Sequence, residues 1–175
     1  MLLTKETVEA YADRARKMEK YKVGEIGDKL YITKMVAFSE QVNNLHVRAK
    51  IRDFEVDNDE PKDLGGMDKG PCPLECLLAA IANCLEQTAL LYFSFFKVKL
   101  KSVKVKVEAI HDVRSSLNPK EIPLPGFKDF KITWFIDSND DPKKIERILD
   151  KVKDICPVKG TVTRTHNFVE EITFP

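Results

Sequence analysis

A long apolar segment, LECLLAAIANCLEQTALLYFSFF, occupies residues 74–96 and constrains the fold more than any other part of the chain. A loop rich in Gly and Pro precedes it, and Pro73 suits the first turn of a helix, where a missing N–H costs nothing. The sequence therefore predicts a helix from about residue 73 to about Phe96. Because apolar residues occur nearly all round this helix, we expect protein to bury it on most sides.

A membrane span is the competing interpretation, because residues 77–96 approach the length needed to cross a bilayer. Asn83, Glu86 and Gln87 argue against it, since each would need a polar partner within hydrocarbon. The N-terminus lacks the uninterrupted apolar stretch of a signal peptide and mixes acids with bases, unlike a transit peptide. We therefore expect a cytoplasmic protein with no membrane partner.

The charge balance argues against a nucleic-acid partner. The 175 residues include 29 Lys plus Arg and 28 Asp plus Glu, so the net charge is +1 and the molecule has no strong overall field. The lysines at 104 and 106 alternate with a stripe of valines, a pattern typical of a solvated sheet face. These features favour a small-molecule or protein partner.

The periodicity along the chain predicts a single α+β domain over residues 1–175, with an N-terminal helical extension at 1–22. Helices are predicted at 4–20, at 73–96 and from Pro142 to near Cys156, where Pro157 stops the last one. Strands are predicted at 29–38 and 45–56, joined around residues 41–44, then around 103–108, at 130–136 and within 162–174. The main loops are predicted at 57–73 and 112–127.

The chain has four cysteines, at positions 72, 76, 84 and 156. A zinc site is one interpretation, but structural zinc ligands usually come in closely spaced pairs, and Cys84 and Cys156 do not fit that pattern. We expect Cys72 and Cys76 to be small apolar packing residues. Cys84 differs because polar residues flank it in an apolar helix, and Cys156 differs because it ends a helix before a proline.

One hypothesis is that Cys84 and Cys156 meet in space as an attacking and a resolving thiol. A thiolate that reduces a peroxide becomes a sulfenic acid, which a second thiol converts to a disulfide. Only a few per cent of an ordinary cysteine is ionised at neutral pH, so a nearby cation, most simply an arginine, would have to favour the thiolate. A carboxylate would then orient that arginine through a bidentate pair.

The residues also resemble a known family. DEPKDLGGMDKGPCPLECLLAAIANCLEQTAL, residues 59–90, is similar to the signature of the OsmC/Ohr family of hydroperoxide reductases, with its glycine pair, Gly-Pro-x-Pro turn and Ala-x-Cys helix. Cys156-Pro157-Val158, followed by Thr161, is similar to the family's second cysteine motif. The resemblance covers roughly residues 28–175 and excludes the N-terminal helix.

The resemblance implies an OsmC-like fold in which two long central helices pack between antiparallel sheets of an intertwined homodimer. It implies a stress-response antioxidant enzyme, an organic hydroperoxide reductase whose thiol reductant the sequence does not identify. The sequence gives no reason to expect a metal or an organic cofactor. Cys84 would be the peroxidatic cysteine and Cys156 the resolving one. The alternative is a small-molecule binding or redox-sensing protein on the same scaffold, without peroxidase turnover.

The remaining site residues follow less directly from the resemblance. The catalytic glutamate of one branch directly follows the turn proline, whereas here Leu74 has that place and Glu75 comes one residue later. One residue turns a helical side chain by about 100°, so Glu75 is a shifted candidate. Arg48 and Arg52, on the predicted strand before the loop, are the candidates for the activating arginine, and Arg164 is a third.

Overall fold

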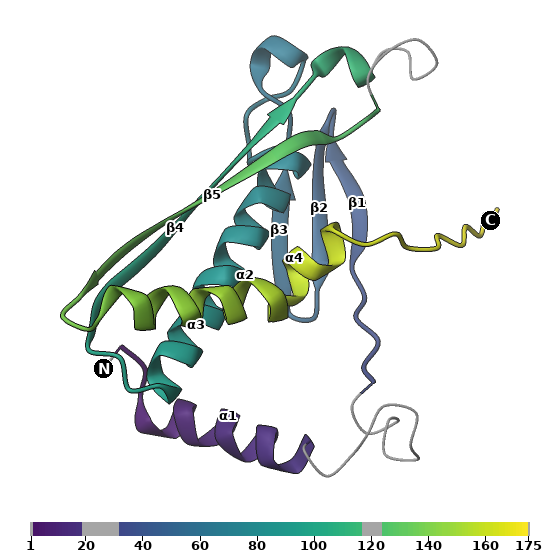
Figure 1. Ribbon diagram of the computed structural model, residues 1–175. Helices are drawn as coiled ribbons and strands as arrows, with labels where there is room; N and C mark the ends of the chain where they lie inside the picture. Colours follow the sequence, from purple (N-terminus) through teal and green to yellow (C-terminus); the bar gives the residue numbers. More distant parts are fainter. Residues whose placement is uncertain (1, 19–31, 117–123, 175) are drawn as a thin grey trace. The chain divides into compact units, whose positions relative to one another are not determined.

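The computed structural model describes residues 2–18, 32–116 and 124–174, and these residues form an α+β fold (Figure 1). They fall into two compact units. The sheet unit comprises Leu3–Ala79 and Val107–Ile132, and the thiol unit comprises Leu2, Ala80–Lys106 and residues 133–174. The α+β class predicted from the sequence is confirmed, whereas the single domain over 1–175 stays a prediction.

A three-stranded antiparallel sheet lies in the sheet unit, in the order β1 (Phe38–Asn43), β2 (His46–Ile51) and β3 (Phe54–Asn58). Two-residue turns join the strands, and the first residue of each turn has a positive φ, 53° at Asn44 and 58° at Arg52. Tight hairpins need this left-handed conformation to match the twist of their strands. Register pairs Arg48 of β2 with Asp57 of β3.

In this region the limits of both predicted strands and of the connection between them are wrong. Residues 32–37 form no strand, and the predicted connection at 41–44 is mostly part of β1; the rest of the predicted strand, 29–31, lies outside the described residues. The segment 45–56 is divided between β2 and β3, so Arg52 lies in a turn and not on a strand. The second turn, Arg52 and Asp53, contains no glycine or proline, so no strong turn signal interrupted the alternating pattern there.

The loop that follows β3 is organised around one buried carboxylate. Asp59 is 1% exposed, and it accepts hydrogen bonds from the backbone N–H groups of Glu60, Met67 and Lys69. Gly66 lies so close to the chain that an added Cβ would be 1.7 Å from the carbonyl oxygen of Glu60. The loop therefore folds back tightly on itself, through a short helix η2 (Lys62–Leu64), and the close approach requires glycine.

Helix α2 (Pro73–Phe95) confirms the predicted central helix, and both of its ends have clear physical causes. At its start, Cys72 is the N-cap: its carbonyl accepts the first helical bond from Cys76 N–H, 3.1 Å. At its end, Val98 N–H bonds the carbonyl of Phe93 and Lys97 N–H bonds that of Ser94, with Lys97 at φ 52°. This is a Schellman motif with lysine in the position that usually holds glycine.

The expectation that protein buries α2 on most sides is wrong for this single chain. Only one stripe is fully buried, formed by Ile81, Leu85, Ala89 and Phe93. Leucines elsewhere on the helix are only half-buried, because no element of the described chain covers them completely. By length and composition α2 could cross a membrane, but the core helix of a soluble protein passes the same test.

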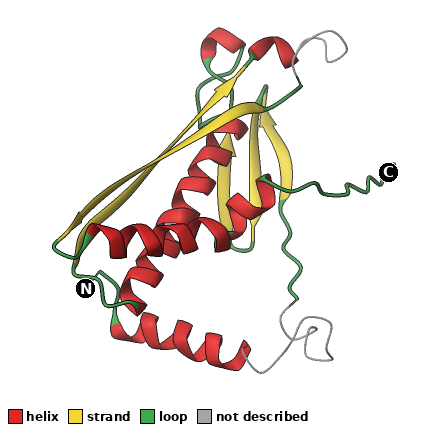
Figure 2. Cartoon of the chain, in the orientation of Figure 1, coloured by secondary structure: helices red, strands yellow, loops and turns green. Residues whose placement is uncertain are grey.

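A long hairpin of β4 (Leu100–His111) and β5 (Phe127–Ser138) forms the second sheet (Figure 2). Both strands extend beyond their predicted limits. Val103 is buried while Lys104 and Lys106 are exposed, so the predicted valine face is confirmed. Helix η3 (Val113–Ser116) follows β4.

Helix α3 (Pro142–Ile155) confirms the second predicted central helix. Asp141 caps it by accepting a hydrogen bond from Lys143 N–H, and Pro142 occupies the first turn. Ile148, Leu149 and Val152 bury its apolar face. After Cys156 the chain forms a short helix, α4 (Pro157–Val162).

The last predicted strand, within 162–174, is wrong: the described residues after α4 have no strand. The segment has the apolar residues of a strand, but Phe168 and Val169 are 89% and 96% exposed. A strand needs a neighbour for its backbone groups, and the segment has none in the described chain. At the other end, α1 (Lys5–Met18) confirms the predicted N-terminal helix, and none of its residues is buried.

Candidate functional site

Two thiols from distant parts of the sequence meet in the thiol unit. Cys84 lies in the middle of α2 and Cys156 lies between α3 and α4. Their Sγ atoms are 3.3 Å apart, with the Cys156 thiol donating to Cys84, and both cysteines are free thiols. A disulfide needs an S–S separation of about 2.05 Å, so closing one requires a movement of only about 1.3 Å.

The Cys-Pro junction explains the position of Cys156. Its backbone N–H donates to the carbonyl of Val152, 3.1 Å away, and so completes the last turn of α3. Its own φ and ψ of −62° and 114° are extended, as expected for a residue before proline. Pro157 then begins α4, and the change of direction leaves the Cys156 side chain enclosed, at 1% exposure.

Burial raises the pKa of the Cys156 thiol, and the neighbouring Cys84 adds to the rise. The backbone N–H groups of Lys159 and Val158 at the start of α4 act in the opposite direction, but they do not outweigh burial. Cys156 is therefore held as a neutral thiol at physiological pH. A neutral thiol that donates to its neighbour suits a resolving cysteine, whose partner is the one that must ionise first.

The surroundings of Cys84 are more apolar than its sequence neighbours suggested. Asn83 and Gln87 point to solvent, and the next residue, Leu85, is buried. Thr88 Oγ1 donates to the carbonyl of Cys84 at 2.7 Å, so its hydroxyl bonds the backbone of its own helix. Within the thiol unit, the described residues place no charged side chain in a hydrogen bond with either sulfur.

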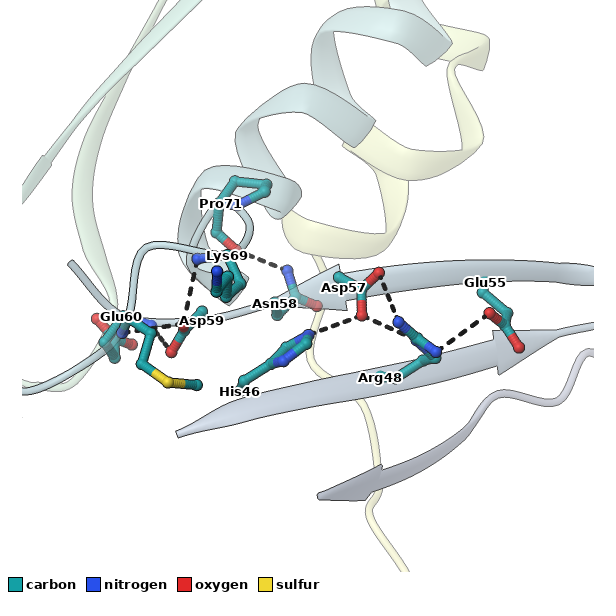
Figure 3. A network of polar contacts seen from close by, with 10 residues as sticks. His46, Arg48, Glu55, Asp57, Asn58, Asp59, Glu60, Lys69 and Pro71 are labelled. Carbon is teal, nitrogen blue, oxygen red and sulfur yellow. Dashed lines mark hydrogen bonds and ion pairs between the residues drawn. The ribbon is translucent and has the colours of Figure 1, made fainter. Parts of the chain in front are cut away.

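A network of charged side chains lies in the sheet unit (Figure 3). Asp57 of β3 accepts a bidentate pair from Arg48 of β2, at 2.9 Å from Nε and 3.3 Å from Nη2. It also contacts His46 Nε2 at 2.8 Å, and Glu55 lies 3.6 Å from the guanidinium. The Arg48 bond, then the His46 bond, hold the pKa of Asp57 below its usual value. Arg48 is thus an arginine oriented by a carboxylate.

Sequence reasoning missed His46 and Asp57. A signal for them was present: His46 and Arg48 are two residues apart on one strand, so both project from the same face. A carboxylate on the neighbouring strand is a natural partner for such a pair. The register could not be found, because the turn at Arg52 was not recognised.

The other two predicted site residues have structural roles in the sheet unit. Arg52 lies in the turn after β2, with its guanidinium carbon 5.1 Å from the ring centre of Phe54. Glu75 accepts a hydrogen bond from the backbone N–H of Cys72 at 2.8 Å. This is one half of a capping box, in which the third helical residue satisfies the N-cap amide. Glu75 therefore stabilises the start of α2 in this structure.

Cys72 and Cys76 are half-buried and do not occupy tight core space as expected. The Asn58 side-chain amide donates to the carbonyl of Pro71 at 2.8 Å and to Cys76 Sγ at 3.0 Å. These contacts fasten the end of β3 to the start of α2. Among the described residues, no group of three or more His, Cys, Asp or Glu side chains is placed to hold a metal ion.

The chain is similar to known proteins in sequence profile and in fold. The profile of the family described as OsmC-like protein matches residues 66–171. An OsmC-like protein from Mycoplasma pneumoniae is 23% identical, with a TM-score of 0.64 over 75% of this chain and 88% of that one. No curated protein sequence matches this chain.

Two further solved structures carry functional names. An organic hydroperoxide resistance protein OsmC from Legionella pneumophila is 20% identical, with a TM-score of 0.56 over 75% of this chain and 90% of that one. An organic hydroperoxide resistance protein from Elizabethkingia anophelis is 19% identical, with a TM-score of 0.57 over 75% of this chain and 89% of that one. At these identities the likeness establishes the fold.

Proposed function

Because the chain belongs to the OsmC-like protein family, we propose that it is a thiol-dependent peroxidase that reduces organic hydroperoxides through a reversible Cys84–Cys156 disulfide. The observation that carries this proposal is the 3.3 Å contact between the two sulfurs, which lie 72 residues apart in the sequence. The names of the structurally similar proteins from Legionella and Elizabethkingia support the class of substrate.

In the proposed reaction the Cys84 thiolate attacks the terminal oxygen of a hydroperoxide. The O–O bond breaks, the alcohol leaves with a proton, and Cys84 becomes a sulfenic acid. Cys156 then attacks the sulfenic sulfur, forming the S–S bond and releasing water. Two electrons pass from the sulfurs to the peroxide, and an external thiol must return them. The apolar stripe of α2 around Cys84 favours alkyl peroxides over hydrogen peroxide.

Arg48 is the best candidate for the activating arginine. The mechanism needs a cation held in a fixed orientation, and Arg48 has the bidentate carboxylate partner that such a role requires. Arg52 lacks a carboxylate partner among the described residues and stacks on Phe54 instead. Arg48 would stabilise both the Cys84 thiolate and the oxygen that leaves.

The proposal includes an intertwined homodimer in the cytoplasm. Two features favour a second copy of the chain: the half-buried leucines of α2 and the exposed apolar side chains of residues 168–174. Both are exposed apolar surfaces of the kind that usually marks a protein–protein interface. In such a dimer the two central helices would be enclosed and the C-terminal segment would gain a partner.

Peroxide consumption by cysteine variants tests the proposal. With an alkyl hydroperoxide and excess dithiothreitol, Cys84→Ser should lose turnover by at least roughly a thousandfold, because the nucleophile is gone. In a parallel assay without dithiothreitol, Cys156→Ser should consume about one equivalent and stop as the sulfenic acid, whereas the wild type should stop as the Cys84–Cys156 disulfide. Cys76→Ser, on the same helix, is the matched control and should keep its rate. Full turnover by Cys84→Ser would refute the proposed role of Cys84, and no turnover by the wild type would favour a binding or sensing protein on this scaffold.

A further inference from the structure

A pocket of about 350 Å³ lies where α3 meets α4, beside the buried Cys156. Cys156 forms part of its wall, beside Pro157 and Gly160. Its polar lining residues, all in the thiol unit, are Lys153, Asp154, Lys159, Thr163 and Arg164. The volume is that of a site for a small molecule and is too small for a protein surface to enter.

The pocket carries an excess of positive charge. Lys153 is paired with Asp150 at 2.9 Å, and Asp154 is the one carboxylate among the lining residues. Lys159 and Arg164 have no carboxylate within ion-pair distance in the described chain. An anion in the pocket would satisfy both cations.

Arg164 follows the end of α4 and bonds back to that helix. Its Nε donates to the carbonyl of Gly160 at 2.8 Å, which fixes the guanidinium against α4. The outer N–H groups of the guanidinium remain free to donate, and their fork geometry matches a carboxylate. Lys159 is half-buried within α4, and the hydrogen bond to Gly160 ties Arg164 to the same helix.

We infer that this pocket binds the carboxylate of a small thiol reductant and so brings its thiol to the Cys84–Cys156 disulfide, an inference that rests on the proposed function. The pocket is lined by Cys156, and the Cys84 sulfur lies 3.3 Å from the Cys156 sulfur. Reduction is the one step of the cycle that needs a second small molecule at these sulfurs.

The reduction itself balances as thiol–disulfide exchange. The thiolate of the reductant attacks Cys84, the more exposed sulfur, and Cys156 leaves and takes a proton. A second thiol then attacks the sulfur of the reductant in this mixed disulfide, and Cys84 leaves as the thiolate. Two reductant thiols become one disulfide, and both protein thiols are restored.

The test compares an anionic thiol with its neutral amide. The Cys84–Cys156 disulfide is first made with diamide, and its reduction by 3-mercaptopropionate or 3-mercaptopropionamide is followed by alkylation and mass spectrometry. Lys159→Gln and Arg164→Gln should each lower the ratio of the two rates about fivefold, the effect of one unit charge near 4 Å in water. The exposed Lys143, at the start of α3, provides the control Lys143→Gln, which should keep the ratio.

Competition gives a second measurement that needs no variant. Succinate, which has carboxylates but no thiol, should slow reduction of the wild-type disulfide by 3-mercaptopropionate and leave the neutral amide unaffected. Equal ratios in all four proteins, or no competition by succinate, would overturn the inference. Diamide makes the disulfide without any peroxide, so the two proposals can fail separately. If the disulfide is reduced faster by the anionic thiol but the protein does not turn over peroxide, the proposed function is refuted and the pocket assignment stands.

Discussion

The two compact units use opposite chemistry around their candidate functional residues. In the thiol unit, Cys84 and Cys156 meet among buried apolar side chains, and burial raises the pKa of Cys156. In the sheet unit, Arg48 and Asp57 pair on a partly exposed sheet, where the arginine lowers the pKa of the carboxyl. The thiol unit keeps the Cys156 thiol neutral, whereas the sheet unit keeps Arg48 and Asp57 charged.

The proposed peroxidase reaction has two requirements, closure of a disulfide and a cation that favours the thiolate, and the two units meet one each. A disulfide closes cleanly where two sulfurs are held by packing, and packing excludes the charges that would favour a thiolate. A cation is held best where a carboxylate fixes it and water still solvates the pair. The comparison therefore predicts that activation and resolution depend on residues of different units, and substitutions can test each half.

The largest expected effect comes from removing the oriented cation. Arg48→Gln should slow peroxide reduction roughly 10²–10³-fold, the usual cost of losing one group that stabilises the transition state. Arg52→Gln is the control, since its guanidinium stacks on Phe54 and has no carboxylate partner in the described chain. Stopped-flow measurement of Cys84 oxidation gives both rates. Equal rates for the two variants would remove Arg48 from the mechanism.

A smaller effect is expected when the carboxylate that orients Arg48 is neutralised. Asp57→Asn keeps a hydrogen-bond acceptor but loses the bidentate ionic pair, so the oxidation rate should fall about tenfold through misplacement of the guanidinium. Glu55→Gln, which alters the longer 3.6 Å contact, is the matched comparison and should change the rate less. A larger loss for Glu55→Gln would contradict the assigned geometry.

In the thiol unit, the raised pKa of Cys156 predicts a stability change at alkaline pH. The unfolded thiol ionises near pH 8.5, while the folded one keeps its proton to higher pH. Its contribution is therefore complete below about pH 8.5 and is lost as the pH rises through the folded pKa. Urea unfolding of the reduced protein between pH 7 and 10 should show a decline that is weaker in Cys156→Ala. Identical pH profiles would contradict the assignment.

The smallest effect concerns the left-handed backbone of Lys97 in the thiol unit. Lys97 ends α2 with φ 52°, a conformation that costs about 1 kcal/mol for a residue with a Cβ. Lys97→Gly should raise the free energy of unfolding by about that amount, which is about 2–4 °C in melting temperature for a chain of this size. Lys99→Gly is the control. Lys99 has no positive φ, so this substitution should not raise the free energy of unfolding.

The sequence predicted helices better than strands, for physical reasons. Pro73, Pro142 and Pro157 mark helix limits by themselves, because proline acts through its own backbone. Strands depend on partners, so the apolar residues 168–174 predicted a strand that the described chain does not form. The turn at Arg52 was missed because left-handed residues other than glycine leave no clear sequence signal.

The candidate site was predictable where it depends on the family motifs. Those motifs singled out Cys84 and Cys156, and the structure places their sulfurs in contact. The partner of Arg48 was not predictable, since Asp57 becomes its neighbour only through the β2–β3 register. Glu75 was chosen by position in a motif, whereas its bond to Cys72 N–H follows from its place in the first helical turn.

Mapping the disulfide after one equivalent of peroxide tests the central claim most directly. The reduced protein is treated with an alkyl hydroperoxide, quenched by alkylation, digested and analysed by mass spectrometry, with Cys84→Ser alongside. A rapid Cys84–Cys156 crosslink that is absent from the variant is the predicted result. Peroxide left unconsumed with Cys84 as a free thiol, or a crosslink through Cys72 or Cys76 instead, would contradict the account.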